Sequence, residues 1–121
     1  MKERDFQSTF NNWLKQVYKK TAAFELKITH TDSLPFNSVK DHQIAALEAA
    51  KWGVLVYKIP DVGYQNPFDC FSLVNVPAFV VIKYASFFCL IDVETFTLER
   101  DRSKRKSLTS ARAKELAHTI V

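Results

Sequence analysis

The sequence predicts an α/β fold, in which a mixed central β-sheet is flanked by helices. Apolar residues recur at three- and four-residue spacing in several segments, and short apolar runs of strand length separate these segments. The chain has 121 residues, which fits a single domain over residues 1–121 with one core of ordinary size. Because 47% of the residues are apolar and 25% are charged, wholesale disorder is excluded.

The first part of the chain predicts a helix, a strand and a loop. Over residues 5–20, large apolar side chains such as Phe6 and Phe10 recur on one face, which predicts an amphipathic helix. Residues 23–29 alternate between apolar and charged side chains, as expected for a strand. Residues 34–36, with a central proline, close a loop.

The next segment predicts a helix that ends at Gly53, followed by a strand over residues 54–59. Gln43 lies four residues after Val39 and four before Leu47, on the stripe of this helix that faces inward. A buried amide must find polar partners, so Gln43 is either a satisfied core residue or a residue that faces a polar site. Two residues could cap the start of this helix, Asn37 and Ser38.

The second half of the chain completes the sheet. Residues 70–74 and 78–84 predict the two strands of a hairpin, and residues 87–93 predict a further strand. A basic loop over residues 100–106 and a short helix over residues 109–118 follow. This order of helices and strands favours a mixed sheet with helices against it.

Composition excludes several classes of protein. Gly53 and Gly63 are the only glycines, so no Gly-rich phosphate loop can form. Cys70 and Cys89 are too few for a disulfide framework, and they indicate reduced thiols in the cytoplasm. The charged N-terminus predicts no signal peptide, and the apolar stretch at residues 73–91 carries a central lysine, so we expect no membrane association.

Glu25 and Lys27 are the first candidates for chemistry. Residues two apart share a face of a strand, so this carboxylate and this ammonium point the same way. Taken alone, the pair could be a weak charge pair on a solvated face. The helix with its inward-facing Gln43 follows directly and favours a polar site instead.

These motifs together resemble the RecU-type Holliday-junction resolvases of the PD-(D/E)XK nuclease superfamily, in particular short members carried by phages. The resemblance covers most of the chain from Phe24 to Leu108. The matching motifs occur in the family's order and read Phe24-Glu25-Leu26-Lys27, Leu34-Pro35-Phe36, His42-Gln43, Ala78-Phe79-Val80-Val81-Ile82, Phe88-Cys89-Leu90-Ile91-Asp92 and Arg105-Lys106-Ser107-Leu108.

The resemblance implies a restriction-endonuclease-like fold and an endonuclease that uses Mg²⁺ or Mn²⁺ to cut branched DNA such as four-way junctions. Two symmetric nicks in a two-fold junction also imply a homodimer. Glu25 and the Leu26 carbonyl would bind the metal, because hard cations prefer oxygen ligands. Lys27 would orient the attacking water or stabilise the phosphorane charge, and Gln43 would fix the water or the phosphate.

The sequence departs from the family at two acids. The aspartate strand that usually precedes the E-x-K strand has no room before Phe24. We infer that this aspartate has migrated to Asp69, which lies between aromatic residues in a strand-like run and would serve as metal ligand and catalytic acid. Gln7 stands where the resemblance implies an acid in the first helix, so Glu3 or Asp5 would have to serve instead.

Three alternatives stay open at the sequence level. Lys83 could be the catalytic lysine, with Asp69 as its acid and Val81 where a second acid should stand. The chain could also be a non-catalytic DNA-binding module on a degenerate nuclease fold, which the missing acid of the first helix favours. A third alternative is a phage nuclease that acts on other DNA intermediates.

A cluster of basic residues is the predicted DNA-binding surface. Five cations fall within seven residues of a chain whose net charge is +4. Such a cluster is either a solvated loop or an arm that contacts phosphates. The five residues are Arg100, Arg102, Lys104, Arg105 and Lys106.

Overall fold

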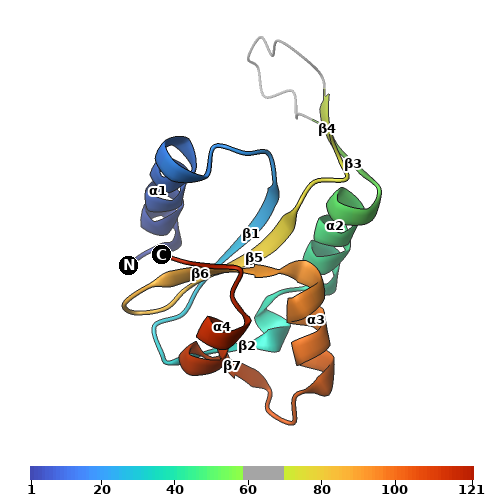
Figure 1. Ribbon diagram of the computed structural model, residues 1–121. Helices are drawn as coiled ribbons and strands as arrows, with labels where there is room; N and C mark the ends of the chain where they lie inside the picture. Colours follow the sequence, from blue (N-terminus) through green and yellow to red (C-terminus); the bar gives the residue numbers. More distant parts are fainter. Residues whose placement is uncertain (59–69) are drawn as a thin grey trace.

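The computed structural model describes residues 1–58 and 70–121, and a mixed four-stranded sheet lies at its centre (Figure 1). Its strands, in spatial order, are β1 (Ala23–Ile28), β5 (Ala78–Lys83), β6 (Phe88–Asp92) and β8 (Thr119–Ile120). β1 runs parallel to β5, whereas β5 and β6 are antiparallel, as are β6 and β8. The predicted α/β class with a mixed central sheet is confirmed.

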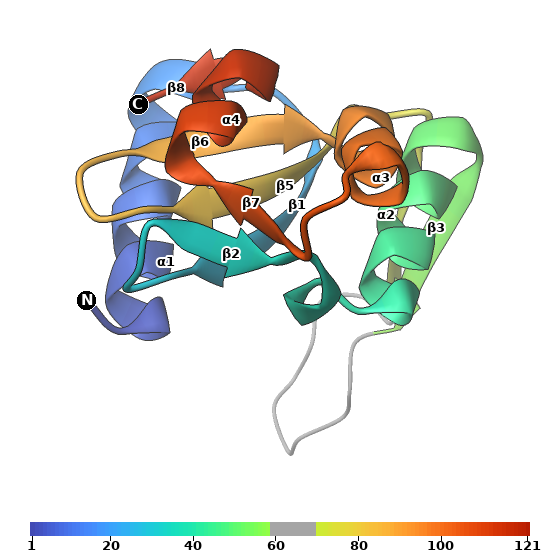
Figure 2. The same ribbon diagram turned by 90° about the horizontal axis from the view of Figure 1, so that it is seen from below.

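Helices cover both faces of the sheet, as Figures 1 and 2 show. On one face Phe10 packs into a cluster with Phe79, and on the other face Leu47 and Phe96 pack with Val80. None of the helices within the described residues is long and apolar enough to cross a membrane. The helices are α1 (Glu3–Trp13) with its π-helical continuation (Leu14–Tyr18) on the first face, and α2 (Asp41–Trp52) and α3 (Val93–Arg102) on the second.

A small second sheet ties the segment after β1 to the C-terminal part of the chain. β2 (Ser33–Pro35) is antiparallel to β7 (Ser107–Thr109), which leads into α4 (Ser110–Leu116). The buried hydroxyl of Tyr84 donates a hydrogen bond of 2.9 Å to the carbonyl of Leu108 in β7. Burial raises the pKa of this hydroxyl, so it stays protonated and remains a donor.

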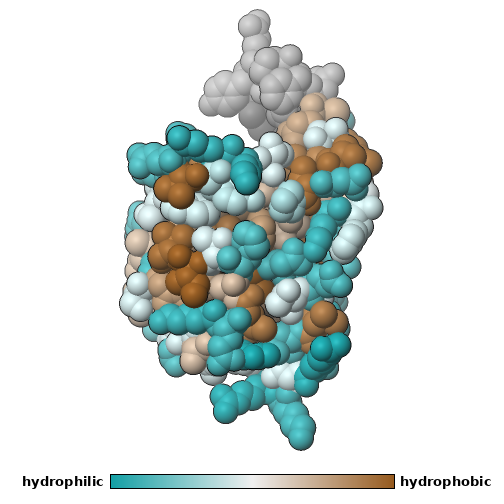
Figure 3. Space-filling model, in the orientation of Figure 1, coloured by the Kyte–Doolittle hydropathy of each residue, from teal (hydrophilic) through white to brown (hydrophobic). Residues whose placement is uncertain are grey.

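β3 (Val54–Lys58) and β4 (Cys70–Val74) form a separate antiparallel ribbon that projects from the rest of the molecule (Figure 1). Several of its apolar side chains are exposed, and Figure 3 shows brown surface in this region, next to the residues drawn in grey. The exposed apolar residues of the ribbon are Val54, Val56, Tyr57, Phe71 and Val74.

The predicted hairpin of residues 70–74 with residues 78–84 is wrong. β4 pairs with β3, whereas β5 pairs with β1 and β6. The N–H of Asn75 donates to the carbonyl of Gly53 at 3.1 Å, which holds the turn against the end of α2. Asn75 has a left-handed backbone (φ 50°), a conformation that asparagine tolerates better than most residues. The chain therefore changes sheet at this turn.

The predicted start of the central helix is also wrong. α2 begins at Asp41, later than a cap at Asn37 or Ser38 would place it. The Ser38 hydroxyl instead donates to the carbonyl of Pro35 at 2.7 Å, within a single 3₁₀ turn that precedes the helix. The predicted end of the helix at Gly53 is confirmed.

The sequence analysis missed α3. β-branched residues are frequent in its first turns, and they favour strands more than helices. The carboxylate of Asp92 caps this helix by accepting a hydrogen bond of 2.9 Å from the N–H of Glu94. Arg100 and Arg102 therefore belong to the last turn of a helix, and residues 100–106 are not one loop as predicted.

The Tyr84→Phe variant tests the contact between the two sheets. We expect the free energy of unfolding to fall by about 1 kcal/mol, because the buried hydrogen bond between the Tyr84 hydroxyl and the Leu108 carbonyl is lost. Urea unfolding followed by circular dichroism measures this change. Tyr57→Phe is the matched control, since that ring is 55% exposed on the ribbon, and equal unfolding midpoints for both variants would contradict the expectation.

Candidate active site and nucleic-acid interface

Glu25 and Lys27 lie on β1, an edge strand of the central sheet. Their register partners on β5 are Val80 and Ile82, so both side chains lie on the face that α2 covers. The Lys27 Nζ lies 3.6 Å from the Glu25 Oε1, and the two side chains are 20% and 27% exposed. The two residues thus form a half-buried ion pair.

The carbonyl of Leu26 lies on the open edge of β1. The N–H of Ala23 donates to the Pro77 carbonyl, and the N–H of Thr29 donates to the Lys83 carbonyl. The backbone N–H and C=O groups of the odd-numbered residues of β1 therefore point toward β5. Because successive residues of a strand direct these groups to alternate edges, the Leu26 carbonyl points away from β5. An oxygen in this position can bind a cation or water.

A hollow of about 290 Å³ lies between α1 and β1. Glu25 and Leu26 line it from the strand, and Glu3 and Gln7 line it from the helix. Glu3 and Asp5 are the two acids that could stand in for the acid missing from the first helix. Glu3 lines the hollow, whereas Asp5 is not among the described residues that line it. Glutamine at position 7 faces the same space, so the hollow has an amide where the resemblance implies an acid.

The donor atoms at this edge are oxygens, the ligand type that hard divalent cations prefer. Glu25 offers a carboxylate, Leu26 a carbonyl on an open edge, and Glu3 a further carboxylate at the hollow. Within residues 1–58 and 70–121, no three His, Cys, Asp or Glu side chains form a group that could hold a metal ion. Asp69, the predicted migrated ligand and catalytic acid, lies outside the described residues.

Gln43 lies in the first turn of α2 and is half-buried. Its side-chain Oε1 accepts a hydrogen bond of 2.9 Å from the N–H of Lys40, the residue just before the helix. This contact caps the helix start, so Gln43 has a structural role that the inward-stripe argument did not foresee. Its amide nitrogen is a donor that this contact does not use.

Lys83, the rival catalytic lysine, lies on the other face of the sheet. Its register partner on β1 is Ile28, whose side chain packs in the cluster beneath α1. The Lys83 Nζ donates to the carbonyls of Tyr84 and Ala85 at 2.5 and 3.2 Å. Lys27 and Lys83 therefore point to opposite faces, and of the two only Lys27 lies beside Glu25.

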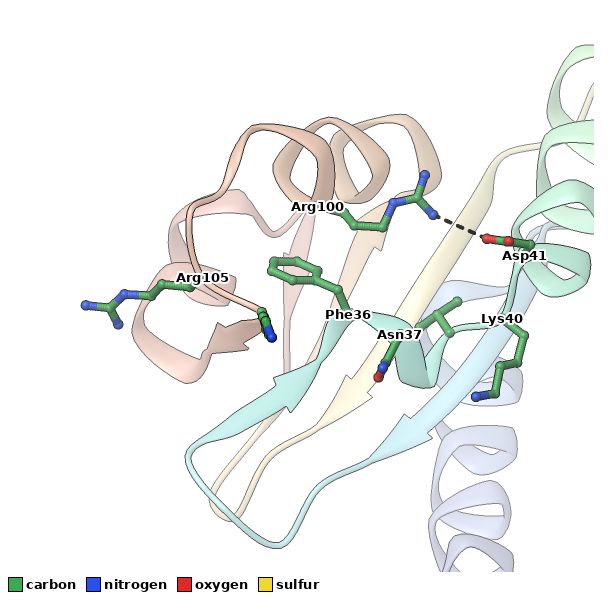
Figure 4. A pocket seen from close by; sticks show the side chains of 8 residues that line it. Phe36, Asn37, Lys40, Asp41, Arg100 and Arg105 are labelled. Carbon is green, nitrogen blue, oxygen red and sulfur yellow. Dashed lines mark ion pairs between the residues drawn. The ribbon is translucent and has the colours of Figure 1, made fainter.

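Part of the basic cluster lines a hollow of about 580 Å³ at the start of α2 (Figure 4). The Nη1 of Arg100 lies 3.9 Å from the Oδ1 of Asp41, while Arg105 points away from both of them. Lys40 also lines the hollow, and the sequence analysis missed it. Its place directly before a helix start, where anions are favoured, is the signal that could have found it. The lining residues are Phe36, Asn37, Val39, Lys40, Asp41, Arg100, Arg105 and Lys106.

The other two predicted DNA-binding residues, Arg102 and Lys104, are exposed. Lys104 lines a neighbouring hollow of about 330 Å³ together with Arg112. The Arg112 Nε donates to Glu99 at 2.6 Å and its Nη1 donates to Glu115 at 2.7 Å. The hydrogen bond from Arg112 lowers the pKa of the Glu99 carboxyl, so both groups stay ionised. Arg112 is thus neutralised locally. Arg100 is also paired, since its Nε donates to Asp101 at 3.1 Å in addition to its contact with Asp41. The exposed Arg102, Lys104, Arg105 and Lys106 are the cations most accessible to external anions.

Comparison with protein-family models, curated proteins and solved structures finds no match to this chain. The functional argument therefore rests on the residues themselves. The structure pairs Glu25 with Lys27 on the α2 face of β1, and it places Glu3 at the hollow that Glu25 and Leu26 line on the side of α1. It also gathers Lys40, Arg100 and Lys106 at the start of α2.

The Gln43→Ala variant tests the capping role of this residue. We expect it to lower the free energy of unfolding by about 1 kcal/mol, because the N–H of Lys40 loses its acceptor. Gln43→Glu should restore most of this loss, since a carboxylate at the same position can accept the same hydrogen bond. Urea unfolding compares the three proteins, and an alanine variant as stable as wild type would show that the cap contributes nothing.

Proposed function

We propose that this chain is a metal-dependent endonuclease that cuts phosphodiester bonds in branched DNA, with a restriction-endonuclease-like fold like that of the RecU-type resolvases it resembles. The observation that carries the proposal is the Glu25–Lys27 ion pair on an edge strand, with the Leu26 carbonyl on the open edge and Glu3 at the adjoining hollow. This arrangement combines oxygen donors for a cation with an ammonium for water or phosphate, which is what phosphodiester cleavage requires.

Glu25 and the Leu26 carbonyl would hold Mg²⁺ or Mn²⁺, together with Asp69 as the migrated ligand. The ion would supply a nucleophilic water near neutral pH and would stabilise charge on the phosphate. Lys27, held beside Glu25, donates a hydrogen bond to the attacking water or to the negative charge that develops on the phosphorane. Gln43 donates from its amide nitrogen to a phosphate oxygen while its Oε1 caps α2.

The basic residues bind the DNA backbone in this proposal. Arg100, Lys106 and Lys40 line one hollow, and the exposed Arg102 and Lys104 extend the positive surface beside it. Contacts of this kind bind phosphates without reading sequence. A homodimer would supply the two symmetric nicks that a four-way junction requires.

This proposal includes a cytoplasmic location for the protein. Cys70 and Cys89 are both free, with Cys70 exposed and Cys89 buried. Burial raises the pKa of the Cys89 thiol to about 12. Unpaired thiols of this kind are compatible with a reducing compartment.

The second candidate function is a DNA-binding module without catalysis. Gln7 at the hollow favours it, because an amide stands where the resemblance implies an acid. A module of this kind would bind junctions through the same basic residues and would not cut them. Cleavage of other DNA intermediates is the remaining alternative, and substrates of different shape separate it from junction resolution.

Lys27→Ala and Asp69→Ala should each reduce metal-dependent nicking by at least about 100-fold, because each removes a group that acts on the reacting phosphate or holds the ion. A labelled four-way junction incubated with Mg²⁺, Mn²⁺ or EDTA measures this. Glu3→Gln should also slow nicking, whereas Asp5→Asn, its matched control on the same helix, should not. Junction binding in EDTA should be nearly unchanged in all four variants.

Lys83→Ala is the control for the rival lysine, and it should cut like wild type. Loss of nicking in Lys83→Ala but not in Lys27→Ala would overturn the assignment of the catalytic lysine. A wild-type protein that binds junctions but never nicks them would favour the non-catalytic module. Equal cutting of junctions and unbranched duplexes would favour the third alternative.

Replacing Arg102, Lys104, Arg105 and Lys106 by alanine should weaken binding to all DNA sequences. Each lost phosphate contact should flatten the slope of log affinity against log salt by about 0.9. Nicking at saturating DNA should change little, since none of the four residues is placed at the reacting phosphate. Lys114→Ala is the matched control, because its ammonium lies 4.7 Å from the Phe87 ring and away from this cluster. Unchanged affinity of the quadruple variant at low salt would show that the cluster is only solvated.

A further inference from the structure

A third hollow, of about 510 Å³, lies at the end of the central sheet where β5 begins and β6 ends. Its volume is within the range of small-molecule sites in proteins. It is not part of the candidate active site or of the basic hollow at the start of α2. One carboxylate lines it, that of Asp92. Most of the other lining residues are aromatic or cationic, and these are Tyr18, Lys20, Lys51, Trp52, Phe79 and His118.

Trp52 is the most unusual residue of this hollow. It is the last residue of α2, and it is 65% exposed although tryptophan is one of the largest apolar side chains. The Nζ of Lys51 lies 4.8 Å from the centroid of its ring. The same Nζ donates to both carboxylate oxygens of Asp92 at 2.8 Å. A fixed cation thus lies against the indole, which holds the ring in place and leaves much of it open to solvent.

Aromatic groups from the opposite layer of the molecule line the same hollow. Tyr18 ends the π-helical segment after α1, and its ring lies 6.4 Å from that of Phe79. The His118 ring lies 5.2 Å from the ring of Phe79, and His118 is exposed. Trp52 belongs to the α2 layer, so flat aromatic surfaces reach the hollow from both faces of the sheet.

We propose that this hollow binds an unpaired base of the DNA, an inference that rests on the proposed function and adds to it a preference for unpaired bases. A base offers a flat aromatic face for Trp52 and a polar edge for His118 and Asn75, which also lines the hollow. Lys20 lies at the same hollow and is exposed, so it can meet the phosphate attached to that base. Stacking on aromatic rings beside cations is how proteins commonly bind unpaired bases.

The position of the hollow relative to the candidate active site supports this assignment. Ala23, the first residue of β1, donates its N–H to the carbonyl of Pro77, which lines the hollow. Glu25 is two residues after Ala23 in β1, and the rise of a strand places the two residues about 7 Å apart. An unpaired base in the hollow would therefore lie close to the phosphate at the active-site edge. A base pair at a branch point can lose its stacking neighbour on one side, so one of its bases is extruded at a lower cost than a base within an uninterrupted duplex.

The test measures binding in EDTA, so that no nicking is required. Three fluorescein-labelled probes are compared: a duplex with one bulged thymidine, the same duplex with an abasic bulge, and the uninterrupted duplex. Trp52→Ala should weaken binding of the bulged thymidine probe by about 5- to 150-fold, the usual effect of removing one stacked aromatic ring. Binding of the other two probes should be unchanged, and Trp52→Phe should retain most of the affinity.

Val56→Ala is the matched control, since Val56 is 61% exposed on the adjacent ribbon and lies outside the hollow. It should bind all three probes like wild type. Equal affinity of wild type and Trp52→Ala for the bulged thymidine probe would overturn the proposal. So would an equal loss on all three probes, because it would indicate a general backbone contact. A wild-type protein that never nicks but still prefers the bulged thymidine through Trp52 would refute the nuclease proposal and leave this one standing.

Discussion

The burial of β5 and β6 on both faces is the constraint on which the rest of the structure depends. Every side chain of β5 from Ala78 to Ile82 is buried, as is every side chain of β6 from Phe88 to Ile91, because helices cover both sides of these strands. Apart from the hydrogen-bonded hydroxyl of Tyr84, the buried residues within the described part of the chain are apolar. Polar chemistry is thereby confined to the edge strand β1, to the ends of the sheet and to the helix termini, since an unpaired charge in the central strands would be too costly.

α2 connects the three surfaces on which the functional proposals rest. Its start contributes Lys40 and Asp41 to the basic hollow, and its end contributes Lys51 and Trp52 to the aromatic one. Its buried face packs on the side of the sheet that also carries Glu25 and Lys27. The ion pair between Lys51 and the cap of α3 fixes the end of α2 against the sheet. The three surfaces proposed to bind phosphate, to cut DNA and to bind a base thus lie within the length of one helix.

The sequence predicted local features well where a residue's role depends on its neighbours in the chain. The alternation over residues 23–29 located β1, and Gly53 marked the end of α2. Glu25 and Lys27 could be assigned to one face, because the two-residue period of a strand requires it. α3 escaped prediction because its first turns are rich in β-branched residues, and the capping bond of Asp92 becomes evident only in three dimensions.

By itself, then, the sequence determined the α/β class, the placement of Glu25 and Lys27 on one face of a strand, and the basic cluster, because periodicity and charge order are local properties of the chain. Tertiary structure alone decided which strands pair, since β4 is next to β5 in the chain but is held against β3 by the turn at Asn75. It also decided that Glu3 lies at a hollow which Glu25 and Leu26 line, that Lys83 lies on the opposite face of the sheet from the Glu25 side chain, and that Trp52 and Tyr18 line one hollow at the end of the sheet. These arrangements depend on how helices pack across a sheet, a long-range effect that residue spacing does not encode.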